Sequence, residues 1–238
     1  MVLAAGLGTR LKPFTERFPK PLIPLHGVPC MEYALLSLSK AGITNVVVNV
    51  HAHPEQLRKY LSSSPIPGLR LSESDESDLL LGSAGGLKKA QPFFRGQPFF
   101  SMNADVFHLA PLDALKERHF QLKRDHGVVM TLLLASGSVL REQEGQYREI
   151  HVDEGRGLIT GLGEKKSKVP FFTGSAIFEP EAFDPVPVGR PAEFVPEVLE
   201  PAIRAGKVGF LYSDALWLDI GSPELWFSGR AKHSSLDF

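Results

Sequence analysis

The sequence has almost no cysteine and no excess of charge of one sign. Cys30 is the only cysteine among 238 residues, which excludes an intrachain disulfide and a cysteine-rich zinc site. We interpret Cys30 as a small buried hydrophobe rather than a nucleophile. The 26 basic and 27 acidic side chains nearly cancel, so no net field favours binding to nucleic acid or to a membrane.

Long apolar runs are also missing. The first apolar stretch, residues 1–5, ends at Gly6 and is too short for the core of a signal peptide, and no other run approaches the length that crosses a bilayer. We therefore expect a cytoplasmic protein. The length predicts a single domain over residues 1–238, built as one large α/β unit with a small attached lobe.

Strand-like and helix-like patterns alternate through the first half of the chain. Buried apolar runs predict strands at 1–5, 45–50, 69–72, 98–103 and 127–135. Helical spacing of apolar residues, with Pro and Gly at the ends, predicts helices at 31–42, from Pro54, at 82–90 and at 112–120. This alternation is typical of βαβ units around a mainly parallel sheet.

The second half is less regular. We expect half-exposed strands at 146–152, 157–163 and 171–178, then a helix over 193–206 interrupted by Pro196 and Pro201, a strand at 215–220 and a closing helix from Pro223. The fold class predicted from both halves is α/β, with a mainly parallel mixed sheet flanked by helices.

The segment "VLAAGLGTRLKPFTERFPKPL" (2–22) places two glycines directly after the first predicted strand. Gly6 and Gly8 leave backbone amides free to face an anion and let phosphates approach closely. A dinucleotide clasp would need a third glycine, but Leu11 occupies that position, and the Gly-Lys-Ser/Thr ending of a phosphate loop is missing. A nicotinamide-binding oxidoreductase is therefore disfavoured.

Two cations complete this segment. Arg10 follows the glycines, and Lys20 lies between Pro19 and Pro21, which fix the backbone and limit the entropy lost when the ammonium group is aimed at a ligand. Two preorganised cations suit a polyphosphate. A solvated basic loop is the alternative interpretation.

The longer stretch "LAAGLGTRLKPFTERFPKPLIPLHGVP" (3–29) resembles the signature of the sugar-1-phosphate nucleotidyltransferases, GxGTRLxPLT followed by PKP. Phe14 stands where Leu is usual, and family members commonly carry two or three more residues ahead of the first strand. The resemblance implies a Rossmann-like, GT-A-like fold with a small sugar-binding lobe. It also implies transfer of a nucleoside monophosphate from a nucleoside triphosphate to a sugar 1-phosphate, with release of pyrophosphate and with Mg²⁺ as cofactor.

The resemblance assigns metal ligands and catalytic residues. Asp105 in "SMNADVF" and Asp219 in "WLDIGSPE" follow predicted strands, where the family holds its metal, although a lone strand-end Asp is more often a cap. The implied mechanism is an in-line displacement in which Asp105 and Asp219 hold Mg²⁺, Lys20 contacts the reacting phosphate, and Arg10 with the Gly6–Thr9 amides holds the departing pyrophosphate. Its catalytic residues are Arg10, Lys20 and Asp105.

The segment "GSAGG" is similar to the family's G-T-A/G-G-x, whose backbone lies along the base of the nucleotide. A glycine-rich helix entry without a ligand is the alternative. The nucleotide-binding residues that the resemblance implies are Leu3, Ala4, Ala5, Gly6, Gly8, Thr9, Arg10, Lys20, Gly82, Ser83, Ala84, Gly85 and Gly86.

The sugar-phosphate side is implied by two further segments. "FFTGSAIF" resembles the family's strand with a Thr/Asn-Gly pair, which nominates Thr173 and Gly174, and "GEKKSK" resembles its Glu-Lys-Pro segment, which nominates Glu164 and Lys165. Lys166 replaces the proline, and a solvated charge run is the alternative there. We also expect Asn103, at a strand end, to contact the sugar phosphate.

The length after "WLDIGSPE" leaves room for about one helix, so we expect no C-terminal β-helix domain. The two expected halves are a nucleotide-binding part at about 1–110 and a sugar-phosphate and second-metal part at about 111–238.

The chain most resembles short bacterial members such as the N-acetylmuramate-1-phosphate uridylyltransferases of peptidoglycan recycling. Mannose-1-phosphate guanylyltransferase and glucose-1-phosphate thymidylyl- or uridylyltransferase activities are the alternatives. A non-catalytic nucleotide-sugar sensor on the same fold is an alternative of a different class. The expected partners are a nucleoside triphosphate and a sugar 1-phosphate, without nucleic acid or membrane, in a monomer or small homo-oligomer.

Overall fold

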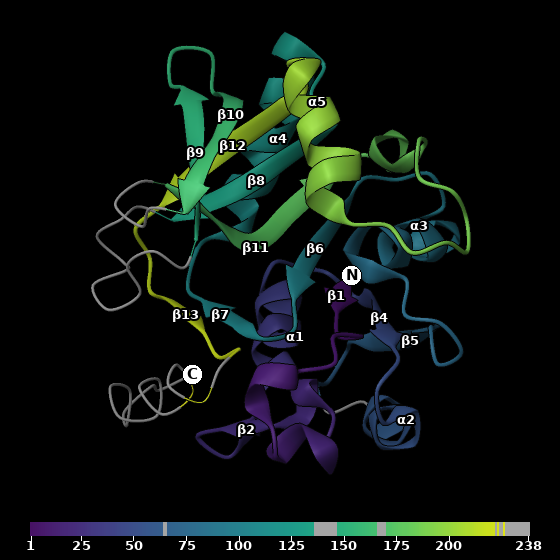
Figure 1. Ribbon diagram of the computed structural model, residues 1–238. Helices are drawn as coiled ribbons and strands as arrows, with labels where there is room; N and C mark the ends of the chain where they lie inside the picture. Colours follow the sequence, from purple (N-terminus) through teal and green to yellow (C-terminus); the bar gives the residue numbers. More distant parts are fainter. Residues whose placement is uncertain (64–65, 136–146, 166–169, 222, 224–225, 227–238) are drawn as a thin grey trace. The chain divides into compact units, whose positions relative to one another are not determined.

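The computed structural model describes residues 1–63, 66–135, 147–165, 170–221, 223 and 226 (Figure 1). The chain divides into two compact units that alternate along the sequence. Unit 1 comprises residues 1–80, 102–108 and 218–238, and unit 2 comprises 81–101 and 109–217. The division into two halves near residue 110 stays a prediction.

Unit 1 contains parallel strands in the order β5-β4-β1-β6. These are β1 (Val2–Leu3), β4 (Asn45–Val50), β5 (Arg70–Asp75) and the end of β6 (Phe99–Asn103). Val2 pairs with Val48 on one side and with Met102 on the other, and all three are fully buried. The β-branched run in β4 suits this position inside a parallel sheet.

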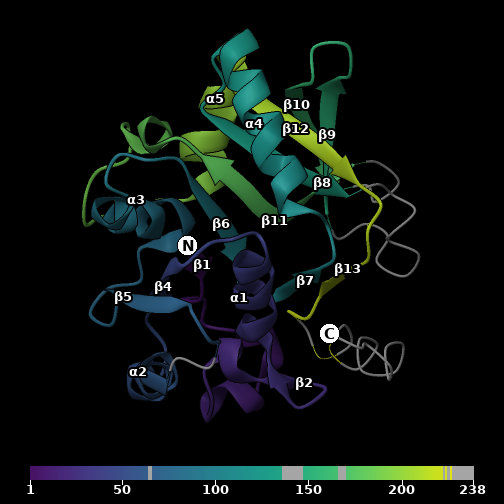
Figure 2. The same cartoon turned by 180° about the vertical axis from the view of Figure 1, so that it is seen from behind.

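Two helices of unit 1 follow the predicted pattern. In α1 (Cys30–Lys40), Met31, Leu35 and Leu38 share the buried face, as expected for the spacing i, i+4 and i+7. Figure 2 shows α1 from its outer side, and α1 packs on β1 and on the short strand β7 (Val106–His108). The second helix, α2 (Pro54–Ser63), begins at Pro54 as predicted.

Residues 9–29 of unit 1 form only short elements. Single 3₁₀ turns, η1 (Thr9–Leu11), η2 (Phe14–Glu16) and η3 (Lys20–Leu22), lead into the hairpin of β2 (Pro24–Leu25) and β3 (Val28–Pro29). Prolines at five positions between 13 and 29 disfavour longer regular elements there. Of the predicted closing helix, only Pro223 and Trp226 belong to the described residues.

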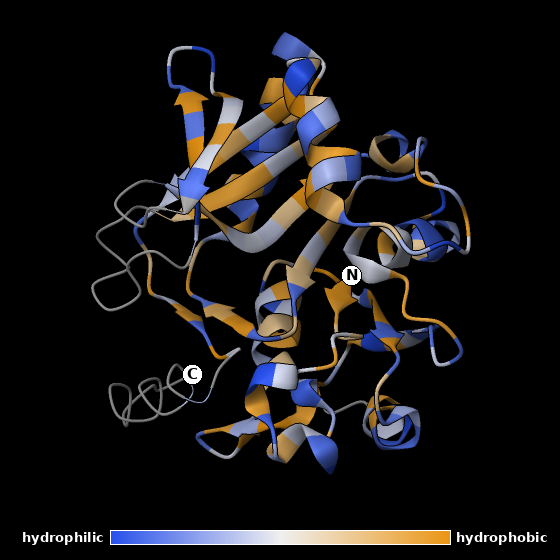
Figure 3. Cartoon of the chain, in the orientation of Figure 1, coloured by the Kyte–Doolittle hydropathy of each residue, from blue (hydrophilic) through white to orange (hydrophobic). Residues whose placement is uncertain are grey.

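Unit 2 contains the strand order β6-β11-β8-β12-β10-β9, with parallel and antiparallel pairs. Its strands are β8 (Met130–Ala135), β9 (Arg148–Asp153), β10 (Leu158–Lys165), β11 (Phe171–Phe178) and β12 (Val208–Ser213). Every residue of β8 is buried, and Figure 3 shows the hydrophobic colour concentrated along it. The predicted α/β class with a mixed sheet is confirmed.

The helices of unit 2 differ from the predictions in their extent. The helix α3 (Gly82–Phe94) runs past Pro92, and α4 (Leu112–His126) is longer than the predicted 112–120. Three basic residues of its last turn, Lys123, Arg124 and His126, suit a helix C-terminus, which Gly127 closes with φ +64. The predicted strand 127–135 therefore begins only at Met130.

The predicted helix over 193–206 is a π-helical turn (Val195–Leu199) followed by α5 (Glu200–Arg204). Pro201 has no N–H for an α-helical hydrogen bond to Glu197, which explains why regular α-helix does not run through this segment. In the described part of the chain, no helix is long and apolar enough to span a membrane.

Candidate active site

The first strand is shorter than the five residues predicted. After Leu3, the backbone amide of Ala4 donates a hydrogen bond of 2.6 Å to Oδ1 of Asn49, a side chain of β4, instead of continuing the ladder. Ala4 and Ala5 remain buried and Gly6 is exposed. The glycine loop, residues 6–9, thus begins two residues after the buried contact between Ala4 and Asn49.

The loop folds back onto the segment that carries Lys20. Gly8 adopts φ +61, and a Cβ on Gly8 would lie 2.7 Å from Cγ2 of Thr15 and 3.0 Å from Cβ of Lys20. The Thr15 hydroxyl donates a hydrogen bond of 2.9 Å to the Gly8 carbonyl. Gly8 is therefore required by its backbone conformation and by this close approach.

Lys20 reaches the carboxylate of Asp105, with which it forms an ion pair. Pro19 is extended before the η3 turn, and Leu22 N donates to the Pro19 carbonyl at 2.9 Å. The side chains of Lys20 and Asp105 are 14% and 23% exposed, so the pair is mostly shielded from solvent and still accessible.

A second pairing brings Asp219 to the same place. The strand β13 (Trp217–Asp219) pairs with β7, and Ile220 N donates to the Asp105 carbonyl at 3.0 Å. Just beyond β13, Gly221 N donates to Oδ1 of Asp219 at 2.6 Å. The two predicted metal ligands therefore flank one short ladder.

Three predicted side chains converge on Gly221. A Cβ on Gly221 would lie 2.7 Å from Oδ1 of Asp219, 3.0 Å from Nη2 of Arg10 and 3.3 Å from Oδ2 of Asp105. With Lys20 on Asp105, the structure brings together the four residues predicted for phosphate and metal contacts in unit 1. Their charges are two positive and two negative.

Cys30 is next to this cluster but is not suited to attack. Burial raises the pKa of its thiol, the negative charge of Asp105 raises it further, and the positive charge of Lys20 opposes this in part. A thiol that stays protonated is a poor nucleophile. This agrees with the interpretation of Cys30 as a buried hydrophobe, since it is 3% exposed.

The residues at Gly221 fit a hard divalent cation. Oxygens of Asp219 and Asp105 both face the Cα of Gly221, where an added Cβ would lie 2.7 and 3.3 Å from them, and Mg²⁺ prefers one or two carboxylates while keeping several waters. Among the described residues, no group of three or more His, Cys, Asp or Glu side chains is arranged to hold a metal. A site of this kind would therefore depend on these two carboxylates and on substrate oxygens.

The glycines at the start of α3 have a structural role within unit 2. The amides of Ala84 and Gly85 both donate to the Ala192 carbonyl, at 3.0 and 3.2 Å, and are occupied there rather than open to a base. A Cβ on Gly82 would lie 2.7 Å from the Ala192 oxygen, and one on Gly85 would lie 2.7 Å from the Arg190 oxygen. The close approach of the segment 190–193 thus accounts for these two glycines.

Ser83 is also engaged at this end of α3. Its hydroxyl oxygen accepts a hydrogen bond of 3.0 Å from Phe194 N. Gly86 is buried in the first turn of the helix. The base-reading role predicted for residues 82–86 stays a prediction.

The predicted sugar residues come from three strands, β6, β10 and β11. The Thr173 hydroxyl donates to the Leu133 carbonyl at 2.9 Å and is buried, and Gly174 has φ +87 at an irregularity of the β11–β8 pairing. Glu164 is exposed near the end of β10, and the Lys165 side chain lies outside the described residues. Asn103, half-buried, ends β6 beside Leu3.

Sequence reasoning missed Asn49, Thr15 and Gly221. The signal for Asn49 is its place in the apolar run "NVVVNV", because a polar side chain in a buried strand must find a hydrogen-bond partner. Gly221 is the glycine of the Trp-x-Asp-x-Gly segment. The spacing of residues within that segment does not indicate that the Arg10 side chain lies next to Gly221.

The model of the nucleotidyl transferase family matches residues 1–234 of the chain. The chain belongs to this family. It is 31% identical to a UTP–glucose-1-phosphate uridylyltransferase of Synechocystis, over 95% of this chain and 61% of that protein. It is 30% identical to an N-acetylmuramate alpha-1-phosphate uridylyltransferase of Neisseria meningitidis, over 93% and 92%. A mannose-1-phosphate guanyltransferase of Neurospora crassa is 30% identical over 99% and 64%.

These relatives differ in how much of their own length the chain covers. The chain spans less than two thirds of the Synechocystis and Neurospora proteins but nearly all of the Neisseria protein. Among solved structures, HddC from Yersinia pseudotuberculosis complexed with GMP-PN superposes with a TM-score of 0.81 at 18% identity, over 98% of both chains. The nucleotidyltransferase fold that the family resemblance implies is confirmed.

Proposed function

We propose that this member of the nucleotidyl transferase family joins a nucleoside triphosphate and a sugar 1-phosphate to give a nucleoside-diphosphate sugar and pyrophosphate. An oxygen of the sugar phosphate forms a bond to the α-phosphorus, while the bond from that phosphorus to the β-bridging oxygen breaks and its electron pair leaves with pyrophosphate. The convergence of Arg10, Asp105 and Asp219 at Gly221 supports this proposal most directly.

The reaction needs no protein nucleophile, because the sugar phosphate itself attacks. Its difficulty is the charge gathered on the phosphate oxygens, which positioned cations and amides neutralise. Lys20 contacts the reacting phosphate, while Arg10 and the amides of the Gly6–Thr9 loop hold the departing pyrophosphate. The left-handed conformation of Gly8 keeps that loop folded over Lys20.

Asp105 and Asp219 would hold Mg²⁺, which when bound supplies positive charge beside the triphosphate oxygens. The carboxylates are prepared for this by their surroundings. The Gly221 amide orients Asp219 through its hydrogen bond of 2.6 Å, and the Lys20 ammonium group orients Asp105. Both contacts also reduce the repulsion between the two negative charges.

The substrates we propose are UTP and N-acetylmuramate 1-phosphate, in cytoplasmic peptidoglycan recycling by a monomer or small homo-oligomer. The support is the Neisseria relative, which matches the chain over nearly the whole of both proteins. Glucose 1-phosphate with UTP or dTTP, and mannose 1-phosphate with GTP, are the alternatives. The balanced charge gives no reason to propose a nucleic-acid partner.

Pyrophosphate release over a grid of five nucleoside triphosphates and three sugar 1-phosphates, with Mg²⁺, tests this assignment. We expect kcat/KM to be greatest for UTP with N-acetylmuramate 1-phosphate. A higher value for another pair would replace the substrates and keep the reaction. Nucleotide binding without pyrophosphate release from any pair would favour a non-catalytic sensor instead.

A further inference from the structure

A chain of hydrogen bonds in unit 1 ends on the amide that begins the glycine loop. Oδ1 of Asn49 accepts from Ala4 N at 2.6 Å, and Nδ2 of Asn49 donates to Oε1 of Glu76 at 2.8 Å. Asn49 is 2% and Glu76 is 1% exposed. Buried hydrogen bonds of this kind are costly to break because neither partner can form a replacement hydrogen bond with water.

The carboxylate fixes which way the Asn49 amide points. An ionised Glu76 only accepts hydrogen bonds, and Ala4 N–H only donates. The Asn49 side chain can satisfy both partners in one orientation alone, with its NH₂ group toward Glu76 and its oxygen toward Ala4. Glu76 therefore keeps the Asn49 side-chain oxygen, which accepts the hydrogen bond from Ala4 N, directed toward Ala4.

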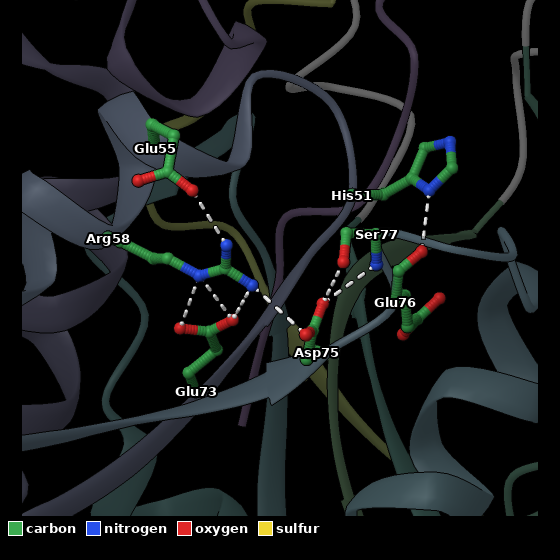
Figure 4. A network of polar contacts seen from close by, with 7 residues as sticks. All are labelled: His51, Glu55, Arg58, Glu73, Asp75, Glu76 and Ser77. Carbon is green, nitrogen blue, oxygen red and sulfur yellow. Dashed lines mark hydrogen bonds and ion pairs between the residues drawn. The ribbon is translucent and has the colours of Figure 1, made fainter.

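Glu76 is itself held from its backbone and from its neighbours (Figure 4). Its amide donates to the Val50 carbonyl at 2.7 Å, and its carbonyl lies 2.7 Å from Nδ1 of His51. The residue before it, Asp75, pairs with Arg58 at 3.0 Å and accepts from Ser77 N at 2.8 Å. The end of β5 is thus fixed from α2 and from β4.

We propose that Asn49, oriented by Glu76, is a positioning residue for the triphosphate. It anchors Ala4, the last buried hydrogen-bonded point before Gly6, so that the Gly6–Thr9 amides face the phosphates. The inference rests on the proposed function, because it assumes that this loop holds the triphosphate. Neither side chain contacts the reacting atoms in this scheme.

Two substitutions test the anchor. Asn49→Asp keeps an acceptor for Ala4 N but places a second carboxylate against Glu76, so the pair repels and the contact to Ala4 is disturbed. Adding Glu76→Gln restores both hydrogen bonds of the side chain at position 49, with the polarity of one reversed, because the new amide donates to the new carboxylate. Asn45→Asp makes the same chemical change at the exposed start of β4 and is the matched control.

The readouts are the affinity for inorganic triphosphate and the hydrogen exchange of the peptide covering residues 2–11. We expect Asn49→Asp to weaken triphosphate binding about tenfold and to speed exchange in that peptide, as for the loss of a buried hydrogen bond to a charged group. The double variant and Asn45→Asp should match the wild type. In turnover, KM for the nucleotide should rise and KM for the sugar phosphate should stay the same.

Triphosphate affinity and peptide exchange unchanged in Asn49→Asp would overturn the inference. If Asn49→Asp does not fold, the double variant is the test. A double variant that folds but binds triphosphate more weakly than the wild type would contradict the positioning role. Both readouts are independent of turnover. A wild type that binds triphosphate but releases no pyrophosphate would refute the proposed function and leave the anchor to be judged by these readouts.

Discussion

The ammonium group of Lys20 is paired with the carboxylate of Asp105, although 85 positions separate the two residues in the chain. Lys20 comes from a 3₁₀ turn between prolines, and Asp105 lies between β6 and β7. Through Asp105 the lysine is joined to the point where Arg10 and Asp219 meet. Four charged residues from three distant segments therefore lie around one point, next to Gly221.

Replacing the lysine should remove activity and leave the fold intact. We expect Lys20→Ala to lower kcat by a factor on the order of 10² or more, as for the loss of a group that stabilises developing charge. Because the two side chains are only 14% and 23% exposed, removing Lys20 also leaves the Asp105 carboxylate without its partner, so we expect some loss of unfolding free energy while the protein stays folded. Lys12→Ala removes an exposed lysine of the same segment, paired with Glu16 at 3.6 Å, and should leave kcat unchanged. Near-normal turnover by Lys20→Ala would contradict the assigned role.

Replacing the first carboxylate should alter the metal dependence. Asp105→Asn keeps the shape of the side chain but loses its charge, so we expect a lower kcat and a higher Mg²⁺ concentration for half-maximal rate. A Mg²⁺ titration of the rate measures both effects. Asp113→Asn, an exposed change in the first turn of α4, is the control. An unchanged Mg²⁺ requirement in Asp105→Asn would exclude Asp105 as a metal ligand.

Gly221→Ala should reduce activity by steric obstruction. The added methyl group would lie 2.7 Å from Asp219 Oδ1 and 3.0 Å from Arg10 Nη2, so these side chains must shift and the metal and pyrophosphate contacts with them. Gly155→Ala is the control, because its nearest neighbour would be at an ordinary 3.4 Å. We expect a drop in kcat/KM of about tenfold or more for Gly221→Ala, since small displacements at a reacting centre are costly. Equal rates for both variants would show that this point carries no substrate or metal.

Gly85→Ala should destabilise unit 2. Its new methyl group would meet the Arg190 carbonyl oxygen at 2.7 Å, a backbone atom that cannot move aside as a flexible side chain could. We expect a loss of about 1–3 kcal/mol in unfolding free energy, typical of overpacking, measured by denaturant titration against Gly155→Ala. Unchanged stability would mean that the segment 190–193 yields readily and that the glycine is there for another reason.

Acid should destabilise the protein through His108. Burial lowers the pKa of His108 from 6.5 to about 4, so between these values the unfolded chain binds a proton that the folded chain does not. The contribution is fully present above pH 6.5, decreases as the pH falls and levels off below pH 4. Its total is about 3 kcal/mol, from 1.36 kcal/mol for each pKa unit. Denaturant titrations from pH 7.5 to 4 should show a shallower loss in His108→Gln, and identical slopes would contradict this origin.

The elements predicted best are those with a clear local signal in the sequence. The strand 45–50 and the helix from Pro54 are observed as expected, because a buried β-branched run and a proline at a first helical turn have few other structures open to them. The end of α4 was missed, since its last turn is polar and is held by capping and charge rather than by burial.

The candidate site was predictable in its residues but not in its geometry. Arg10, Lys20, Asp105 and Asp219 come from motifs, and motif spacing carries no information on which distant segments meet. The convergence at Gly221 and the anchoring of Ala4 by Asn49 arise from β7–β13 pairing and from the early end of β1. Conversely, Gly82 and Gly85 look like ligand glycines in sequence, and in the structure they lie against a neighbouring backbone.

The most direct test of the proposed reaction follows a label on the α-phosphorus. UTP labelled there is incubated with N-acetylmuramate 1-phosphate, Mg²⁺ and the full chain, and the products are separated and counted. We expect the label to move into a nucleoside-diphosphate sugar, with one pyrophosphate released for each molecule formed, and Lys20→Ala to slow both on the order of 10²-fold or more. Label that stays in UTP across the whole substrate grid, or that appears as free UMP, would contradict it.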